Sequence, residues 1–332
     1  MPAKPIDEVD LLDRLQQVLR AASPGCEVDG LSPLQGGASS ITYWTTFTGT
    51  DGSAHKVVLK VAPAGLEPTK NRDMLRQARV HHALDGSGVP VPRVLGEHAG
   101  TPPDIPPFFV MDFEPGDCIE PNFMAPDERP TPAQVRGREL DSARILGRLH
   151  TVDPTAVGLA DEPVVTLADE LARWTNSLAA CDEDLREGSE EVAQLLAETM
   201  PPMGPPVLMH GDFRLGNALC LDDRVVCIID WEIWARGDAR VDLGWFLMMA
   251  NPDETMGRTA SAGMPSEPEL LDTYQAARGV EVKGLDWFAA LVRYKQTATG
   301  ALIARNARRR GLPETPNGGR AALLASAKAL LA

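Results

Sequence analysis

Two short segments of the sequence contain the residue types that phosphoryl transfer requires. Residues 210–217 read His-Gly-Asp-Phe-Arg-Leu-Gly-Asn and place Asp212 five positions before Asn217. Asp230 follows thirteen positions later, in the run Ile-Ile-Asp-Trp-Glu at the end of an apolar stretch. Asp212 can accept the proton of an attacking hydroxyl group, and Asn217 and Asp230 offer the oxygen ligands that Mg²⁺ prefers. These three residues are the candidate base and metal ligands for transfer of a phosphoryl group from ATP to an alcohol.

The spacing of Asp212 and Asn217 is also that of the base and the metal-binding amide in protein-kinase catalytic loops. We therefore expect neighbouring residues to hold a loop in place. His210 should do so by hydrogen bonds, and Asp242 should be buried and accept backbone hydrogen bonds from the loop. Arg214 either contacts phosphate or holds the loop, and the sequence leaves both open.

A glycine-containing stretch is the candidate phosphate-binding loop. Residues 34–42 read Leu-Gln-Gly-Gly-Ala-Ser-Ser-Ile-Thr. Glycine has no side chain to keep phosphate oxygens away from backbone N–H groups, so Gly36, Gly37 and Ser39 are the candidate contacts. A simple turn between two strands is the alternative interpretation.

Lys60 is the candidate partner of the α- and β-phosphates because it ends the apolar run Val-Val-Leu at residues 57–59. A helix carboxylate normally holds such a lysine. The helix expected at residues 71–84 offers Asp73 and Gln77 on one face, and Gln77 is neutral. Either Asp73 or the phosphates themselves would then neutralise the lysine, with Gln77 limited to a hydrogen bond.

Hydrophobic periodicity predicts an α+β fold with a small antiparallel sheet followed by a mainly helical part. The expected strands are residues 28–34, 41–48, 56–62, 107–113, 206–209 and 224–230. The expected helices are residues 7–22, 71–84, 166–181, 188–200, 239–249, 267–278, 284–310 and 319–331, with further helical periodicity through Leu140 to Leu149. The composition changes after residues 114–116, and a proline-rich stretch follows from Pro121 to Pro132.

Composition restricts the partners of the 332-residue chain. A formal net charge of −15 makes nucleic acid and anionic membranes poor partners, because both are polyanions. The five cysteines show no paired metal spacing, which favours a reducing compartment. No stretch approaches the roughly 18 apolar residues of a membrane span, and the first residues do not resemble a signal peptide. We therefore expect a cytoplasmic protein; the sequence specifies no oligomeric state.

These motifs together resemble the aminoglycoside phosphotransferase and choline kinase group of small-molecule kinases, and most of all the kinase-like domains related to those of acyl-CoA dehydrogenase proteins. The resemblance implies a protein-kinase-like fold with a nucleotide-binding lobe at residues 1–113 and a helical lobe at residues 114–332. It also implies ATP bound between the lobes, with adenine at the backbone of Met111 to Glu114, so that Met111 and Phe113 are candidate contacts. Family members usually carry glutamate where Gln77 falls.

The acceptor stays open at this stage. Relatives act on amino-sugars, other alcohols or hydroxyacyl thioesters, and candidate walls are residues 234–245 and the helix with Tyr294, Lys295 and Arg305. An arginine cluster at residues 305–310 favours an anionic acceptor or is simply a helix-end surface. Because Gln77 departs from the family, a catalytically inert nucleotide-binding protein is the alternative to a kinase.

Overall fold

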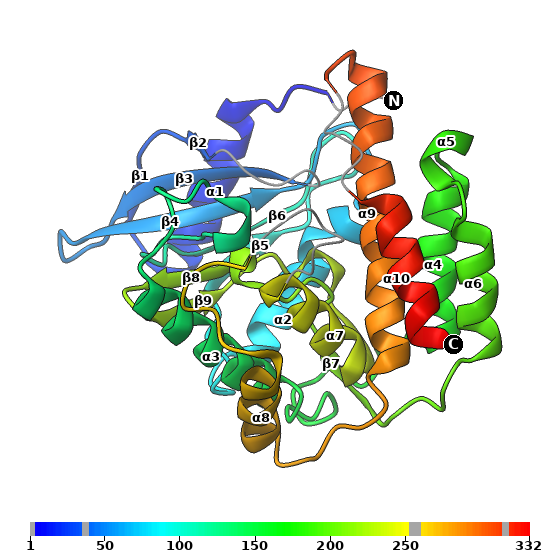
Figure 1. Cartoon of the computed structure of the whole chain (residues 1–332). Coiled ribbons are helices and arrows are strands. Elements are labelled where there is room, and N and C mark those ends of the chain that lie inside the picture. Colours follow the sequence, from blue (N-terminus) through cyan, green and yellow to red (C-terminus); the bar gives the residue numbers. More distant parts are fainter. Residues whose placement is uncertain (1–3, 35–39, 252–259, 314–318) are drawn as a thin grey trace. The chain divides into compact units, whose positions relative to one another are not determined.

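The computed structural model describes residues 4–34, 40–251, 260–313 and 319–332, which form two compact units (Figure 1). The first unit consists of residues 1–117 and 226–234, and the second of residues 118–225 and 235–332. Residues 226–234 thus belong to the first unit, although in the sequence they lie between the two segments of the second unit.

An antiparallel sheet forms the centre of the first unit. Its described strands are β1 (Glu27–Val28), β2 (Ser32–Leu34), β3 (Ile41–Thr48), β4 (Ala54–Val61), β5 (Val94–His98) and β6 (Phe108–Asp112). They lie in the order β1-β3-β4-β6-β5, and β2 also pairs with β3. The helices of this unit are α1 (Glu8–Ala22), η1 (Lys70–Arg72), α2 (Met74–Leu84) and η4 (Trp231–Ile233). The predicted antiparallel sheet and the opening helix are confirmed, whereas β5 has no counterpart among the predicted strands.

Alternation along β4 directs its side chains to both faces of the sheet. Val57 and Leu59 are fully buried in a cluster with Leu15 of α1. Val58 points to the other face and packs against a cluster that contains residues of α2. Lys60 shares the face of Val58, so it projects from a central strand on the side that α2 covers.

The second unit is mainly helical. Its helices are η2 (Pro121–Phe123), α3 (Pro132–Leu149), α4 (Leu167–Ala179), α5 (Glu183–Arg186), α6 (Ser189–Glu198), η3 (Leu215–Asn217), α7 (Ala239–Ala250), α8 (Glu267–Arg278), α9 (Asp286–Arg310) and α10 (Arg320–Leu331). Its strands are β7 (Pro206–Met209), β8 (Ala218–Leu221) and β10 (Ala235–Asp238), and β9 (Arg224–Ile228) contains the boundary between the units. β7 pairs with β10, and β8 with β9.

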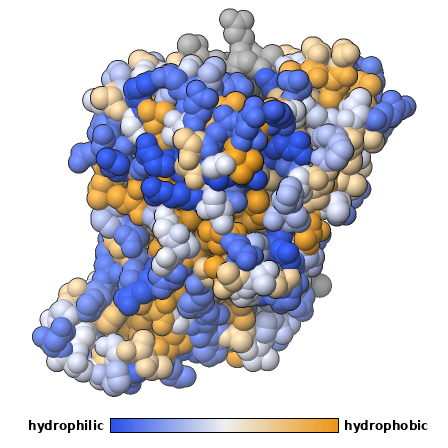
Figure 2. Space-filling view, turned by 90° about the horizontal axis from the view of Figure 1, so that it is seen from below, coloured by the Kyte–Doolittle hydropathy of each residue, from blue (hydrophilic) through white to orange (hydrophobic). Residues whose placement is uncertain are grey.

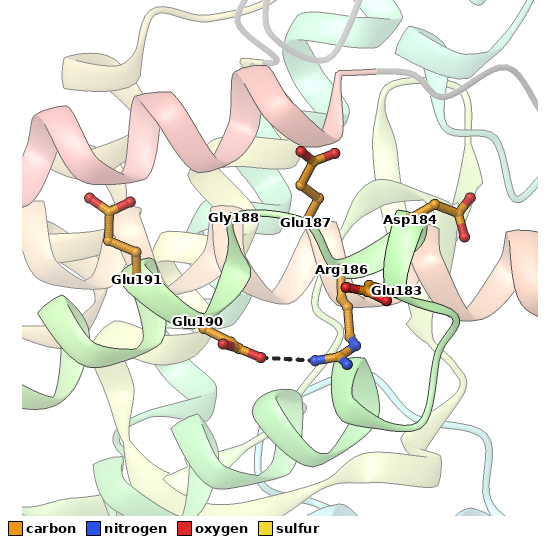
Figure 3. Close-up of a pocket in the computed structure, with 7 residues that line it drawn as sticks. All are labelled: Glu183, Asp184, Arg186, Glu187, Gly188, Glu190 and Glu191. Atoms are coloured by element: carbon orange, nitrogen blue, oxygen red, sulfur yellow. Dashed lines mark hydrogen bonds and ion pairs between the residues drawn. The ribbon is translucent and has the colours of Figure 1, made fainter.

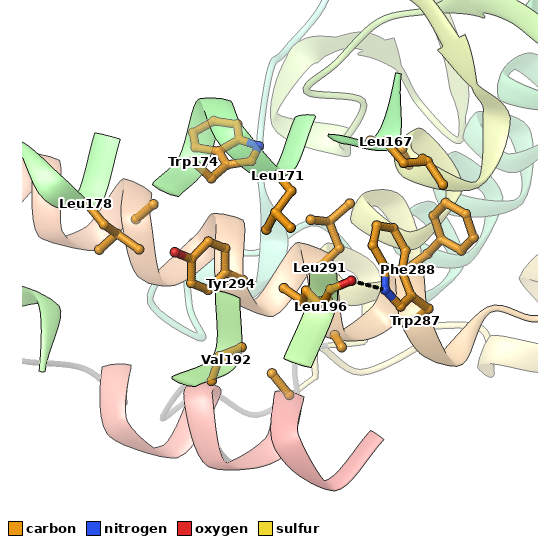
Figure 4. Packing of buried hydrophobic residues seen from close by; sticks show 14 of the residues in the cluster. Leu167, Leu171, Trp174, Leu178, Val192, Leu196, Trp287, Phe288, Leu291 and Tyr294 are labelled. Carbon is orange, nitrogen blue, oxygen red and sulfur yellow. Dashed lines mark hydrogen bonds between the residues drawn. The ribbon is translucent and has the colours of Figure 1, made fainter. Parts of the chain in front are cut away.

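Large apolar side chains from several helices build the core of this unit (Figure 4). The 25-residue helix α9 contributes Trp287, Phe288 and Leu291, which are buried against α4 and α6. Trp287 also donates through Nε1 to the Leu196 carbonyl oxygen at 3.0 Å. Figure 1 shows α9 alongside α4, α6 and α10. α9 is therefore firmly packed, and it can hold in place the segments that its inward-facing side chains contact.

Capping side chains determine where the helices begin. Thr131 and Gln134 form a capping box at α3, and Thr166 and Asp169 form one at α4. Such caps satisfy N–H groups that have no partner within the helix. Asp238 accepts a hydrogen bond from the Arg240 N–H and caps α7.

Hydrophobic and hydrophilic residues lie intermixed on the face of the molecule in Figure 2. Large apolar side chains that are exposed come from separate elements, among them Val9, Phe123 and Ile303. Scattered residues of this kind are normal on protein surfaces. Within the described ranges, no helix combines the length and the apolar character that a membrane span needs.

Candidate active site

The loop at residues 210–217 lies in the second unit, directly after the buried end of β7. Asn217 Nδ2 donates to the Asp212 carboxylate Oδ2 and to the Asp212 carbonyl oxygen, each at 2.9 Å. Both bonds use the nitrogen of the Asn217 amide, so its oxygen is the atom left to face a cation. The structure therefore brings the predicted base and one predicted metal ligand together.

Asp242 holds the start of this loop. It is fully buried on α7 and accepts hydrogen bonds from the His210 N–H at 2.6 Å and the Gly211 N–H at 2.7 Å. Burial alone raises the pKa of the Asp242 carboxyl, but His150 and the His210 N–H outweigh it and bring this pKa below its ordinary value. His210 Nδ1 in turn accepts from the Asp212 N–H at 3.2 Å. The structural roles predicted for Asp242 and His210 are confirmed.

Glu120 is a loop-holding residue that the sequence motifs do not indicate. Its carboxylate Oε2 accepts a hydrogen bond from the Gly216 N–H at 3.0 Å and lies 3.5 Å from Arg214 Nη1. Arg214 Nε is also 3.5 Å from the Asp212 carboxylate. Burial lowers the pKa of Arg214, but Asp212 and Glu120 more than reverse this and raise it. Of the two roles left open for Arg214, these contacts favour holding the loop.

Asp230 lies in the first unit, next to Lys60. The Lys60 ammonium Nζ is 3.2 Å from Asp230 Oδ1, and both side chains are partly buried. Asp230 has φ +67° and ψ +52°, in the left-handed region that few residues other than glycine adopt. Trp231, whose Nε1 donates to the Ile228 carbonyl oxygen at 3.1 Å, fixes the following turn. Such a backbone persists only where its surroundings hold it, and it is typical of functional sites.

Neither helix residue considered for Lys60 contacts it. Asp73 caps α2 by accepting from the Arg76 N–H at 3.0 Å. Gln77 is buried and donates to the Asn71 carbonyl oxygen at 3.0 Å. Of the alternatives left open for Lys60, these local backbone hydrogen bonds of Asp73 and Gln77 do not favour a helix partner. Among the described residues, the charge partner of Lys60 is Asp230.

The remaining predicted nucleotide contacts lie partly outside the described residues and partly in and after β6. Gly36, Gly37 and Ser39 lie outside the described residues. Met111 is in β6 and packs in the apolar cluster on the α2 side of the sheet. The Phe113 N–H donates to the Lys56 carbonyl oxygen at 3.2 Å.

The proposed acceptor walls are largely core residues. Trp234, Trp245, Tyr294 and Lys295 each have at most 4% of their surface exposed. Their burial agrees with the usual role of large aromatic rings in core packing, and the position of the acceptor stays a prediction. Arg305 donates to the Ala180 carbonyl oxygen at 3.1 Å.

A pocket of about 890 Å³ in the second unit is lined by acidic residues and contains none of the loop residues (Figure 3). Cations already pair with several of these carboxylates: Arg186 with Glu190 at 2.8 Å and Lys328 with Glu191. Arg308 pairs with Asp184 at 2.6 Å. These pairs indicate a solvated surface, and they favour the helix-end interpretation of the arginine cluster.

Each of the two predicted metal ligands offers an oxygen atom, the donor that Mg²⁺ prefers. No group of three or more His, Cys, Asp or Glu side chains suited to a metal occurs within the ranges that the structure covers. Mg²⁺ is commonly held by one or two protein oxygens together with substrate phosphates. The side-chain oxygen of Asn217 in the second unit is a donor of that kind, and so, in the first unit, is the carboxylate of Asp230.

Sequence comparison links the chain to phosphotransferases. The model of the family described as "Phosphotransferase enzyme family" matches residues 30–291. Acyl-CoA dehydrogenase family member 10 of Mus musculus is 26% identical over 213 residues, which are 63% of this chain and 19% of that protein. Probable acyl-CoA dehydrogenase IBR3 of Arabidopsis thaliana is 28% identical over 269 residues, 72% of this chain and 31% of that protein. The matched part of the chain thus spans 19% to 31% of the length of these relatives.

Solved structures share the fold. A Ralstonia eutropha protein assigned as an aminoglycoside phosphotransferase superposes with a TM-score of 0.72 at 21% identity, over 96% of both chains. Macrolide 2′-phosphotransferase MphH of Brachybacterium faecium gives a TM-score of 0.55 at 20% identity, over 97% of this chain and 98% of that one. The predicted α+β, kinase-like fold is confirmed.

Proposed function

Because the chain belongs to the phosphotransferase enzyme family, we propose that it is an ATP- and Mg²⁺-dependent kinase that phosphorylates a hydroxyl group of a small molecule. The observation that carries this proposal is the hydrogen bond between Asp212 and Asn217 in a loop held by buried Asp242. Transfer of a phosphoryl group to a hydroxyl requires a carboxylate base close to a metal ligand, and both residues must be held in place by the surrounding structure.

Each residue has a role in this reaction. Asp212 accepts the proton of the acceptor hydroxyl as its oxygen attacks. Asn217, through its side-chain oxygen, and Asp230 hold the cation, and Lys60 holds the phosphates. MgATP, when bound, would supply the phosphoryl group, and its Mg²⁺ would neutralise the charge that develops on the leaving oxygens. The loop at residues 210–217 provides the base, Asp212, and the sheet provides the cationic side chain, Lys60.

A nucleotide-binding lobe at residues 1–113 and a helical lobe at residues 114–332 belong to the same proposal. This division differs from the compact units, which group residues 226–234 with the sheet. We assign the phosphates to backbone N–H groups around Gly36, Gly37 and Ser39, and the adenine to the chain near Met111 and Phe113. A reducing, cytoplasmic setting is supported by five cysteines that are all free thiols.

The acceptor is a small alcohol rather than a macromolecular polyanion, given the net charge of −15. The names of the comparison proteins suggest aminoglycosides and macrolides for testing, and the resemblance to kinase-like domains of acyl-CoA dehydrogenase proteins adds hydroxyacyl thioesters as a third class.

The test is transfer of labelled phosphate from γ-labelled ATP to members of these classes, with and without Mg²⁺. We expect formation of the phosphorylated product to require Mg²⁺. In Asp212→Ala we expect kcat to fall about 10²- to 10⁴-fold. ATP binding by the folded protein without Mg²⁺-dependent turnover on any alcohol would contradict the proposal and favour the inert nucleotide-binding alternative.

A further inference from the structure

Lys295 places a buried positive charge against the loop that carries Asp212. It lies on α9 with 3% of its surface exposed, and its ammonium Nζ donates to the Gly211 carbonyl oxygen at 2.6 Å. The same nitrogen is 3.8 Å from the centre of the Trp245 ring and 5.4 Å from that of Trp174. Burial of an ammonium is costly unless partners compensate it, and two aromatic faces and a carbonyl do so here.

Gly211 is the peptide unit through which Lys295 reaches the base. Its φ of +88° lies in the region that side chains other than that of glycine rarely adopt. Asp242 accepts the Gly211 N–H at 2.7 Å, and Lys295 donates to the Gly211 carbonyl. Two charged side chains from α7 and α9 thus hold both polar groups of the residue that precedes Asp212.

The charges around Lys295 come from each element packed against it. The pKa of Lys295 is lowered overall: burial is the largest cause and Arg173 of α4 acts in the same sense, whereas Asp212, Glu170 of α4 and Asp242 of α7 oppose this in part. Glu170 is itself engaged, because it accepts from Trp174 Nε1 at 2.7 Å. The Gly211 carbonyl is therefore the direct polar contact of the ammonium in the described structure.

We propose that Lys295 is a positioning residue for phosphoryl transfer, which fixes the Gly211 peptide and through it the direction of the Asp212 carboxylate. This inference rests on the proposed function. If Lys295 merely filled space in the core, an uncharged side chain of similar length and shape would serve equally well. Methionine is such a side chain, and glutamine adds an N–H donor at a shorter reach.

The experiment compares Lys295→Met and Lys295→Gln with Thr297→Val, a control that removes a buried hydrogen bond of the same helix to the Arg293 carbonyl oxygen. MgATP turnover is followed as ADP release, with the best alcohol of the acceptor panel. We expect kcat to fall about 10- to 100-fold in Lys295→Met with KM for ATP within about threefold, because small misplacement of a catalytic group is that costly. The kcat of Lys295→Gln should lie between that of Lys295→Met and that of the wild-type protein.

Amide hydrogen exchange of a peptide covering residues 209–218 gives a readout that does not need activity. Exchange should be about tenfold faster in Lys295→Met, at least threefold faster in Lys295→Gln and unchanged in Thr297→Val. A folded Lys295→Met protein with wild-type loop exchange, or with kcat within threefold of wild type, would overturn the inference. If Lys295→Met does not fold, loop exchange in Lys295→Gln equal to that of the control overturns it. If the wild-type protein shows no turnover, the proposed function fails, and the exchange result then decides only whether Lys295 holds the Gly211 loop.

Discussion

Asp212 belongs to a loop whose backbone is held by charged side chains that are distant in the sequence. Asp242 accepts two N–H groups at its start, Lys295 donates to a carbonyl oxygen beside the base, and Glu120 accepts an N–H near its end. Each contact is a hydrogen bond to a charged group, which is stronger than one between neutral groups. The loop therefore has little freedom left, as expected of a group that must be aligned before a phosphoryl transfer.

Replacement of Asp242 tests this support at the residue scale. Asp242→Asn keeps the shape of the side chain but removes the charge that accepts the His210 and Gly211 N–H groups. Hydrogen bonds to charged groups contribute about 1.5–3 kcal/mol each, so we expect the free energy of unfolding in urea to fall by at least about 1.5 kcal/mol. Turnover should fall as well. Unchanged stability together with unchanged kcat would show that the loop is held by other contacts.

At the scale of elements, α2 and η4 are tied together by a reciprocal pair of hydrogen bonds. Arg76 Nη2 donates to the Trp234 carbonyl oxygen at 2.7 Å, and Trp234 Nε1 donates to the Arg76 carbonyl oxygen at 3.0 Å. The Arg76 guanidinium also lies 4.1 Å from the centre of the Trp234 ring. Because Asp230 immediately precedes η4, these contacts help to fix its backbone.

We expect Arg76→Ala to lower the free energy of unfolding by about 1.5–3 kcal/mol and to weaken MgATP binding. Arg93→Ala is the matched control, since Arg93 is largely exposed in its pair with Asp112 and such pairs contribute about 0–1 kcal/mol. Urea unfolding and calorimetric titration with MgATP measure both effects. Equal losses of unfolding free energy and of MgATP affinity in Arg76→Ala and Arg93→Ala would show that the α2–η4 contact has no special role.

Helix α3 carries a buried acid whose effect on stability depends on pH. Burial, assisted by the nearby Glu120 charge, raises the pKa of Glu139 well above its ordinary value of 4.5. The folded protein then retains a proton that the unfolded chain loses, so the contribution of Glu139 to stability falls as pH rises above about 4.5.

Glu139→Gln removes this proton linkage. We expect the variant to raise the unfolding temperature by about 2–4 °C at pH 8, the shift that corresponds to roughly 1 kcal/mol, and by less at pH 4.5. Calorimetric scans of both proteins at the two pH values measure the difference. A gain that is larger at pH 4.5 than at pH 8 would mean that the Glu139 carboxyl does not keep its proton in the folded protein.

At the scale of the whole molecule, the sequence predicted the elements that depend on local pattern and missed those that depend on distant partners. β7 and α8 have the predicted bounds because periodicity and capping determine them. β10 has no counterpart among the predicted strands. It contains Gly237, where a Cβ would lie 2.5 Å from the Met209 side chain of β7. Pairing with β7, and not propensity, makes β10 a strand.

The candidate site divides in the same way. Asp212 and Asn217 were found by their spacing, and their contact follows from the loop itself. Glu120 and Lys295 lie 96 and 84 positions from the loop residues they bind. No local pattern indicates such contacts, because tertiary packing of η2 and α9 creates them. The partner of Lys60 was missed for the same reason, since Asp230 is 170 positions away.

The most direct test asks whether Asn217 and Asp230 serve one magnesium-nucleotide. Asn217→Ala, Asp230→Ala and the double variant form a cycle in which the affinity for MgATP is measured by calorimetry, after circular dichroism has shown that each variant is folded. Two ligands of the same cation should give a coupling free energy of about 1–3 kcal/mol between the substitutions. Losses of affinity that add to within about 0.5 kcal/mol, or no loss in either single variant, would contradict a shared metal site.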